Sequence, residues 1–405
     1  MTEAIELQGA GRASHIRVVG AVSAAHFVSH YYIILLAPLL PFVRADYGVS
    51  YTEIGIAFAA FNVVSALLQT PAGFLVDRFG ARILLIGGLS LGATALMVAG
   101  LVNSFWVMVA MFAVAGLGNT VYHPADYALL SQHVPAKSIG QAFSIHTFAG
   151  MLGSGVAPGS LLLLHGFFGW RGAFVGAAIM GFAVAALLVV LREEPAVHAG
   201  RRAADPVEKT KSGSLRLLIS APILLNLLFF VLLAMISGGI QNYSVVALGA
   251  MYGTPVNTAN AGLSAYLLLS SVGVLAGGVL VSRTTRHGAV AAVGLALMAL
   301  LTVVVGEFKL GNLLLIAAMA VNGFFFGFMM PSRDMIVREV TPPGSFGKVF
   351  GFVTTGFNIG GVVSPLIFGA LMDHGNPRAV FLLVTASTLL AIVTVATRPH
   401  RTYAR

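Results

Sequence analysis

The sequence repeats itself at a shift of 207 residues, and this duplication constrains the fold more than any other feature. Proline and glycine decide where a helix bends and how closely it packs, so matched positions predict two halves with the same helix shapes. The matched pairs are Gly116 and Gly323, Pro124 and Pro331, Pro135 and Pro342, Gly140 and Gly347, Gly153 and Gly360, Pro158 and Pro365, Arg171 and Arg378, and Phe174 and Phe381.

The duplicated regions are apolar over lengths that suit a lipid bilayer. Apolar residues make up 58% of the 405 positions and charged residues only 9%, whereas a soluble domain carries about 25% charged residues. One helical crossing of the hydrocarbon core needs about 20 apolar residues. Twelve such segments are predicted, and the links between them are short. The predicted spans are 17–43, 52–76, 82–102, 105–131, 138–164, 170–191, 217–248, 258–281, 288–306, 311–337, 345–371 and 378–397.

One long charged stretch, residues 192–216, separates the halves and is typical of a solvated connector. We therefore predict a six-helix bundle over residues 1–191, a cytoplasmic linker over 192–216 and a second six-helix bundle over 217–405. The predicted fold class is all-α integral membrane, with twelve transmembrane helices in two pseudo-symmetric bundles.

The net charge of +9 follows from topology, because the basic residues gather on one side of the predicted membrane. By the positive-inside rule, both termini then face the cytoplasm of a bacterial inner membrane. This distribution argues against a nucleic-acid partner. The links on the outer side hold only Arg44, Arg171, Lys309 and Arg378, whereas the inner side includes Arg78, Arg82, Lys137, Arg201, Arg202, Lys209, Lys211, Arg283, Arg286, Arg338 and Lys348.

The link after the second span carries a compact charged motif, Gly73-Phe-Leu-Val-Asp77-Arg78-Phe-Gly80-Ala-Arg82. Its counterpart in the second half keeps Arg283 but has Ser282 in place of Asp77. Together with the duplication, this motif resembles the major facilitator superfamily over nearly the whole chain. The resemblance implies a gating role for Asp77, Arg78, Arg82 and Arg283. An acid and an arginine at helix ends can stabilise one packed state and separate in the other, although a cluster that only sets topology is the alternative.

A narrower resemblance, to the fosmidomycin-resistance type of efflux carrier, covers the region from Gly116 to Gly159 and part of the first span. This chain departs from related carriers in having His30 where they often have an acid, and Phe112 where drug–proton antiporters usually have an arginine. The residues that carry the resemblance are Gly116-Leu-Gly118-Asn119, His123-Pro124-Ala-Asp126, Gly150, Gly153, Pro158-Gly159 and His26-Phe-Val-Ser29-His30.

Ionisable residues within the spans are few, and each is a candidate for function, because a charge at a helix centre costs about 2.5–3.5 kcal/mol on insertion scales. Asp126, Arg333 and Asp334 lie well inside predicted spans, and the repeat aligns Asp126 with Arg333. We therefore expect Arg333 to pair with Asp126 or with Asp334, in a contact that follows proton or substrate binding. The alternative is that these groups lie near the cytoplasmic helix ends and hold that side closed.

Histidines gather in the first half, where His26, His30, His123, His146 and His165 lie in or beside the spans. Imidazole titrates near physiological pH, so it can carry a proton or hold an anionic substrate. His26 and His30 are four residues apart and share a helix face. We assign proton coupling to Asp126, Asp334, His30 and His123, with a hydrogen-bonded packing role as the alternative for each histidine.

No metal or cofactor is predicted. The chain has no cysteine, so a thiolate site cannot form. A zinc site would have to draw histidines from three helices without an evident carboxylate partner.

The other polar residues of the spans can line a cavity or bond one helix to another. The predicted substrate cavity consists of His26, His30, Tyr31, Asn62, Gln69, Asn119, His123, His146, Gln241, Asn242, Asn322, Arg333 and Asn358.

These features predict a secondary active transporter, functional as a monomer in the lipid bilayer, that moves a small organic solute by alternating access. No nucleotide-binding motif of the Walker type is present, so protons are the expected energy source. The resemblance to the fosmidomycin-resistance type implies proton-coupled efflux. The excess of cationic groups equally suits proton-coupled uptake of a small organic anion such as a carboxylate. An intramembrane enzyme using His123 and Asp126, or a channel, is the remaining alternative.

Overall fold

The computed structural model describes residues 2–135, 138–191, 215–342 and 345–396, and every regular element within these ranges is helical. Of the predicted linker, only residues 215 and 216 lie within the described residues. The helices are α1 (Thr2–Ile34), α2 (Leu36–Tyr47), α3 (Tyr51–Phe79), α4 (Ala81–Leu101), α5 (Phe105–Asn119), α6 (Tyr122–His133), α7 (Ile139–Val190), α8 (Leu215–Leu218), α9 (Ala221–Gly238), the π-helical turn η1 (Gly239–Tyr243), α10 (Ser244–Tyr252), α11 (Val256–Val281), α12 (His287–Glu307), α13 (Asn312–Glu339), α14 (Phe346–Asp373) and α15 (Arg378–Ala396).

Eleven helical stretches of the described chain are long and apolar enough to cross a membrane. One of them, α7, has 52 residues and bends at Gly169, where φ is +70°. This length is more than twice the roughly 20 residues that one crossing needs, so α7 forms two crossings and the described residues form twelve. The predicted twelve-helix fold class is therefore confirmed.

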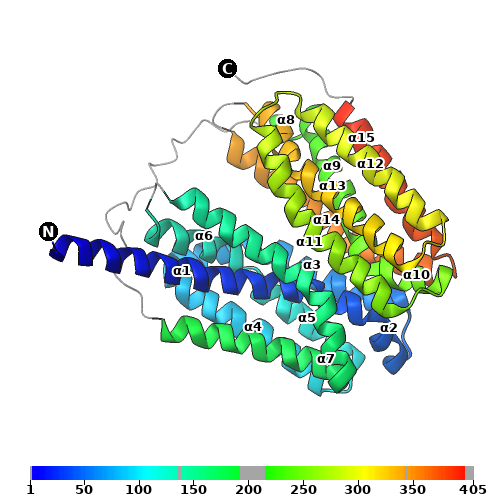
Figure 1. The fold of residues 1–405 in the computed structure, drawn as a ribbon, viewed down its shortest axis with the longest axis horizontal. Coiled ribbons are helices and arrows are strands. Elements are labelled where there is room, and N and C mark those ends of the chain that lie inside the picture. The colour runs from blue at the N-terminus through cyan, green and yellow to red at the C-terminus, as the bar shows by residue number, and fades with distance from the viewer. Residues whose placement is uncertain (1, 136–137, 192–214, 343–344, 397–405) are drawn as a thin grey trace.

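The crossings form two bundles that lie side by side (Figure 1). The bundles diverge toward the end of the molecule where α1 begins and α15 stops, which we call the terminal end. They come together at the opposite end, where α2 and α10 lie, which we call the joined end.

The predicted duplication recurs in the packing of the two halves. Gly153 of α7 lies against the backbone of α1 at Phe27. In the second half, Gly360 of α14 lies against α9 at Ala234, which is 207 residues beyond Phe27. A Cβ atom has no room at either glycine, so the matched glycines let the helix backbones approach at equivalent points.

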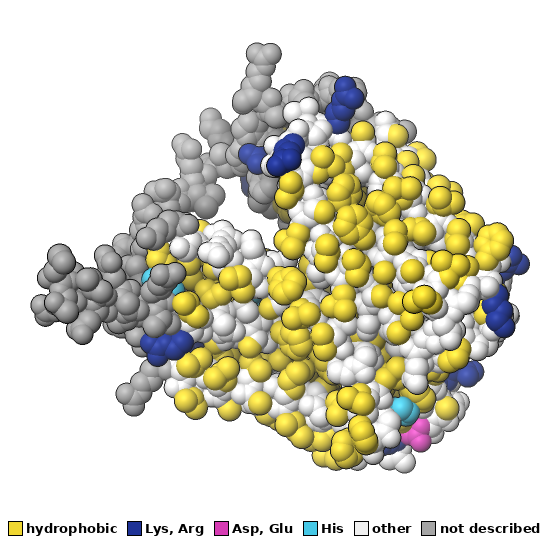
Figure 2. Space-filling model, in the orientation of Figure 1, with side chains coloured by type: hydrophobic (Ala, Val, Ile, Leu, Met, Phe, Trp, Pro, Cys, Tyr) yellow, Lys and Arg dark blue, Asp and Glu magenta, His cyan; other side chains and the backbone are white. Residues whose placement is uncertain are grey.

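Apolar side chains cover much of the outer surface, as expected of a multi-pass membrane protein. Leu67 is 70% exposed and Leu313 is 82% exposed, an exposure that lipid rather than water makes favourable. Figure 2 shows apolar side chains spread over both bundles and Lys and Arg side chains at the ends of the helices.

At the joined end, a hydrogen-bonded contact between α14 and α3 connects the halves. Asp373 Oδ1 accepts a hydrogen bond from the backbone N–H of Tyr51 (2.8 Å). Asp373 Oδ2 accepts from the backbone N–H (2.8 Å) and the hydroxyl (2.6 Å) of Thr52. The Asp373 carboxylate thus caps the first turn of a helix in the other half, where unpaired N–H groups attract a negative charge. We call this contact the Asp373 clamp.

Candidate functional site

Two cavities lie between the halves, and His30 and Gln241 line both of them. The first has a volume of about 460 Å³, and we call it the amide cavity. Its polar lining residues are His30, Tyr32, Asn62, His123, Ser237, Gln241, Asn242, Asn358 and Ser364. The second has a volume of about 470 Å³, and we call it the arginine cavity. Its polar lining residues are His30, Thr147, Ser154, Gln241, Ser270, Arg333 and Asp334.

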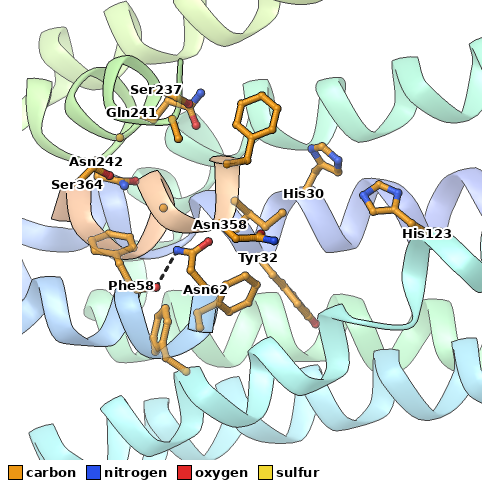
Figure 3. Close-up of a pocket in the computed structure, with 17 residues that line it drawn as sticks. His30, Tyr32, Phe58, Asn62, His123, Ser237, Gln241, Asn242, Asn358 and Ser364 are labelled. Carbon is orange, nitrogen blue, oxygen red and sulfur yellow. Dashed lines mark hydrogen bonds between the residues drawn. The ribbon is translucent and has the colours of Figure 1, made fainter. Parts of the chain in front are cut away.

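In the amide cavity, imidazoles and amides lie at different ends (Figure 3). His30 and His123 are at one end, Asn62 and Asn242 are toward the other, and Asn358 lies between them. Phenylalanines, among them Phe58 and Phe112, complete the wall. A small organic molecule with a polar group and an apolar body fits such a lining.

Two amide residues of this wall, Gln241 and Asn242, belong to the π-helical turn η1. A π-helical turn holds one extra residue per turn and recurs at functional sites. The hydroxyl of Tyr243 at its end donates a hydrogen bond to the carbonyl oxygen of Pro365 in α14 (2.6 Å). This bond fixes the turn against α14 and thereby positions the side chains of Gln241 and Asn242.

In the arginine cavity, Arg333 forms one of the two pairs that the sequence predicts. Its Nε and Nη2 atoms each lie 2.8 Å from Asp334 Oδ1. The guanidinium carbon also lies 5.0 Å from the ring centroid of Phe230 and 5.3 Å from that of Phe357. Both distances allow cation–π attraction, so the guanidinium of Arg333 interacts with one carboxylate and two aromatic rings.

Asp126 does not meet Arg333 but lies in a buried group of histidines within the first half. His146 Nε2 is 2.9 Å from Asp126 Oδ2, and His26 Nδ1 is 3.4 Å from the same oxygen. The ring of His26 stacks on that of His146, with 3.8 Å between centroids. The predicted Asp126–Arg333 pair is therefore absent from this structure, because the nearer imidazoles occupy the carboxylate.

Two more imidazoles connect this group to the cavities. The ring of His26 lies 4.6 Å from that of His30 and 5.3 Å from that of His123, measured between centroids. We call His26, His30, His123, Asp126 and His146 the histidine cluster. Asp126 is 0% exposed and His146 is 1% exposed, so the cluster reaches the cavities only through His30 and His123.

The interior of the histidine cluster has unused hydrogen-bonding capacity. Within the described chain, Asp126 Oδ1, His26 Nδ1 and His146 Nδ1 are buried without a hydrogen-bond partner. A lone buried carboxylate is costly unless a positive charge or a proton accompanies it. A proton shared between Asp126 and an adjacent imidazole is one form of compensation that this geometry allows.

The same atoms raise the question of a metal ion. The ligand atoms of His26, Asp126 and His146 lie within 4.8 Å of one another. Imidazoles that bind one zinc ion point their lone pairs at a common point about 2.0–2.1 Å from each nitrogen. His26 Nδ1 and His146 Nε2 both approach Asp126 Oδ2, but the two rings are stacked, with 24° between their planes, which differs from the geometry of imidazoles around a zinc ion. We therefore assign no metal ion to these residues.

Several residues predicted for the cavity wall bond neighbouring helices instead. Asn322 donates a hydrogen bond to the Thr302 hydroxyl (2.9 Å), and Asn119 donates one to the Ser65 hydroxyl (3.4 Å). Both contacts lie within a single half. Tyr31 has its hydroxyl 2.9 Å from that of Ser160.

Of the remaining predicted wall residues, Gln69 is exposed on α3, and His26 and His146 lie behind the wall in the histidine cluster. Neither cavity is lined by these three residues. The lining predictions that match the two cavities are those for His30, Asn62, His123, Gln241, Asn242, Arg333 and Asn358.

The predicted gating residues occupy the terminal end. Asp77, Arg78 and Arg283 are exposed there, and Asp77 has no ion pair among the described residues. Arg82 contacts the last turn of α7. Its Nη2 atom donates hydrogen bonds to the carbonyl oxygens of Leu188 (2.6 Å), Val189 (3.2 Å) and Leu191. In this structure Arg82 therefore joins α4 to α7 within one half.

Sequence reasoning missed several hydroxyl-bearing residues of the cavity walls and the Asp373 clamp. Ser237 and Ser364 line the amide cavity, and Ser154 Oγ lies 3.3 Å from His30 Nδ1. Ser154 follows His146 by eight residues, which places both on one face of α7. This spacing could have indicated that Ser154 lies near the histidines. No local pattern connects Asp373 to Tyr51.

Comparison with known proteins agrees with this architecture. The family model described as Major Facilitator Superfamily matches residues 22–254 and 227–404. The fosmidomycin resistance protein of Escherichia coli (strain K12) is 24% identical over 389 residues, covering 93% of this chain and 92% of that protein. The probable sulfoacetate transporter SauU of Cupriavidus necator is 24% identical over 401 residues, covering 88% of this chain and 87% of that protein.

Among solved structures, a bacterial homolog of the human lysosomal transporter Spinster, in an inward-facing and unoccupied conformation, has the same fold. The TM-score is 0.75 at 15% sequence identity, and the match covers 95% of this chain and 94% of that one. The resemblance predicted from the loop motif, the duplication and the histidine-containing segments is thus confirmed.

Proposed function

This chain belongs to the Major Facilitator Superfamily, and from this membership we propose that it is a proton-coupled secondary active transporter of a small organic solute. It works by alternating access in the bacterial inner membrane, with both termini in the cytoplasm, as a monomer and without enzymatic chemistry. Transport is the activity named for relatives that cover most of the chain. The basic residues at the terminal end support the orientation.

The histidine cluster is the observation that supports proton coupling. A fully buried carboxylate with imidazoles around it can gain or lose a proton only through the residues that reach the cavities. His30 and His123 supply that route, because both line the cavities and an imidazole can take up and release a proton. Asp334, the other predicted coupling acid, lines the arginine cavity and is paired with Arg333.

Efflux in exchange for protons is the first candidate for the direction of transport. One relative is named for resistance to fosmidomycin, and resistance is consistent with removal of a compound from the cell. In this proposal Asp77, Arg78, Arg82 and Arg283 hold the terminal end closed in the opposite state of the cycle, when the Asp373 clamp is open.

Uptake of a small organic anion together with a proton is the second candidate, and the charges around the cavities favour it. His30, His123 and Arg333 line them, and the one acid among the described lining residues, Asp334, is occupied by Arg333. Protonation of either histidine adds a positive charge beside the solute, so a proton and an anion would bind together. A relative named as a probable transporter of sulfoacetate, an anion, is consistent with this candidate.

Reconstitution into liposomes that contain a pH-sensitive dye tests both candidates. An inward gradient of solute is imposed for a panel of organic anions, amphiphilic drugs and phosphonates. Solute entry that acidifies the lumen indicates symport, and entry that makes it alkaline indicates antiport. We expect Asp126→Asn to abolish the proton movement and His30→Ala to reduce it strongly.

His165→Ala is the matched control, because His165 lies in the same half but stacks on Phe42 outside the histidine cluster. This variant should move protons as the unmodified protein does. Solute entry without any proton movement would contradict proton coupling. Chemical conversion of the solute would instead indicate an enzyme, and entry that does not saturate would indicate a channel.

A further inference from the structure

We propose that the segment of α7 from His146 to Gly155 transmits the protonation of the histidine cluster to the interface between the halves, and that Gly150 is its central positioning residue. This inference rests on the proposed proton coupling. In this inference, one stretch of helix couples a change in protonation to a change in how the two bundles pack.

One face of this segment is built against the histidine cluster. His146, Gly150 and Ser154 follow one another at intervals of four residues and so share a helix face. His146 Nε2 is 2.9 Å from Asp126 Oδ2, and Ser154 Oγ is 3.3 Å from His30 Nδ1. The segment therefore contacts both the buried carboxylate and the imidazole that lines the cavities.

Gly150 lies between these two contacts and brings the helix backbone onto the rings. A Cβ atom at Gly150 would collide with the imidazoles of both His26 and His30. No side chain separates α7 from the rings at this point. A shift of either imidazole therefore acts directly on the backbone of α7.

The adjacent face of the same segment packs on the other half. A Cβ atom at Gly155 would collide with the side chain of Leu268 in α11. One turn further, a Cβ atom at Gly159 would lie 4.0 Å from Ser264 Oγ, again in α11. At a rise of about 1.5 Å per residue, Gly150 and Gly155 are separated by only about 7.5 Å along the helix.

These contacts connect two closely packed points, Gly150 against the imidazole rings and Gly155 against Leu268. A proton that enters or leaves the cluster changes its charge by one unit and alters the hydrogen bond between Asp126 and His146. Closely packed interiors respond to such a change by switching between discrete arrangements rather than by gradual deformation. Because α7 is in direct contact at Gly150 and again at Gly155, the new arrangement of the rings is passed to α11 and hence to the second half.

Other titratable and charged groups also face the cluster and must be considered. They are Tyr32 of α1, Tyr122 and Tyr127 of α6, and Arg333 with Asp334 across the arginine cavity. Tyr127 meets the rings of His123 and His146 with its own ring, whereas Gly150 brings a helix backbone against the rings of His26 and His30.

The test is Gly150→Ala in liposomes, with two transport modes compared. Exchange of solute at equal pH on both sides requires binding and alternating access but no net use of the proton gradient. Accumulation driven by a pH gradient requires coupling as well. We expect exchange to stay within about twofold of the unmodified protein, while accumulation falls by about tenfold, within the range of coupling between two sites. The pH that gives half-maximal accumulation should also shift, because the added methyl group displaces His26 and His30.

Gly166→Ala is the matched control, because it lies on the same helix and a Cβ atom there meets nothing within 4 Å. It should leave exchange, accumulation and the pH profile unchanged. Ser154→Ala provides a second test that adds no atoms. We expect it to shift the pH profile in the same assay while the protein remains as stable as the unmodified chain in detergent.

Gly150→Ala with full accumulation and an unshifted pH profile would overturn the inference and leave the proposed function standing. Loss of exchange and accumulation in equal proportion would also overturn it, because that result indicates a purely structural glycine. An unmodified protein that exchanges solute without moving protons would overturn the proposed coupling, and this inference with it.

Discussion

Asp126 and Arg333 occupy equivalent places in the repeat, yet their surroundings are different. Imidazoles enclose Asp126 in the first half, whereas Asp334 and two phenyl rings hold Arg333 in the second. The duplication has kept the position of an ionisable residue in each half and changed its chemistry. One half thus places a carboxylate among imidazoles at this position, and the other places a guanidinium beside a carboxylate.

Two asparagines that look alike in the sequence have different roles in the structure. Asn322 is 1% exposed and bonds Thr302, whereas Asn358 lines the amide cavity. We expect Asn322→Ala to lower the free energy of unfolding by about 0.5–2 kcal/mol, as for other interhelical hydrogen bonds in membranes, with an unchanged KM for solute.

Asn358→Ala should do the opposite, raising the KM with little effect on stability. Thermal unfolding in detergent and initial rates of solute exchange measure the two effects. A raised KM for Asn322→Ala at normal stability would show that Asn322 faces the solute after all.

Apart from the start of α1, which lies at Thr2 rather than at residue 17, the ends of the crossings followed from the sequence to within a few residues, whereas departures from regular helices did not. Short polar links bracket each apolar run, so the position of a span is a local property. The π-helical turn η1 has no such signature, because packing of Tyr243 against Pro365 determines it. The contact between Arg82 and α7 was not predicted for a related reason, since the α7 carbonyl groups that it contacts lie more than 100 residues away in the sequence.

The contacts of Arg82 predict that it stabilises the C-terminal end of α7. A cation beside the last carbonyl groups of a helix contributes up to about 2 kcal/mol. We expect Arg82→Gln to increase amide hydrogen exchange in the last turn of α7, Leu188 to Leu191, by about fivefold to thirtyfold for a loss of 1–2 kcal/mol.

Arg283→Gln is the comparison, because Arg283 is exposed in the equivalent link of the second half. That variant should leave exchange in α7 unchanged. Normal protection of this turn in Arg82→Gln would mean that the arginine acts only in gating.

At the scale of the whole molecule, the sequence predicted two bundles and a central cavity but not how the bundles meet. The repeat and the apolar spans are properties of each half alone. The Asp373 clamp joins Asp373 to Tyr51 and Thr52, which lie in the opposite half and are separated from it by 322 and 321 positions in the sequence. Likewise, the sequence identified the histidines of the histidine cluster but not their contact with Asp126, because that contact depends on the packing of α1, α6 and α7. Contacts between halves arise from shape and spacing that no single segment encodes.

The Asp373 clamp has a consequence for the transport cycle. For the joined end to open, the carboxylate must leave the first turn of α3. Replacing an acid at a helix N-terminus costs about 0.5–2 kcal/mol, so Asp373→Ala should favour the state in which this end is open. A cysteine introduced at Ser364, a buried position in the amide cavity, reports that opening, because the natural chain has no cysteine.

In intact cells, a membrane-impermeant maleimide should label Ser364→Cys faster when Asp373→Ala is also present, by about twofold to thirtyfold for the same free-energy range. Asp46→Ala is the matched control, because Asp46 is also an exposed acid at the joined end but pairs with Arg171 inside the first half. It should not change the labelling rate. Equal labelling with and without Asp373 would show that α14 and α3 are held together by packing alone, at Gly55 against Pro365 and at Gly369 against Thr52, and that the carboxylate does not set the balance between the two states.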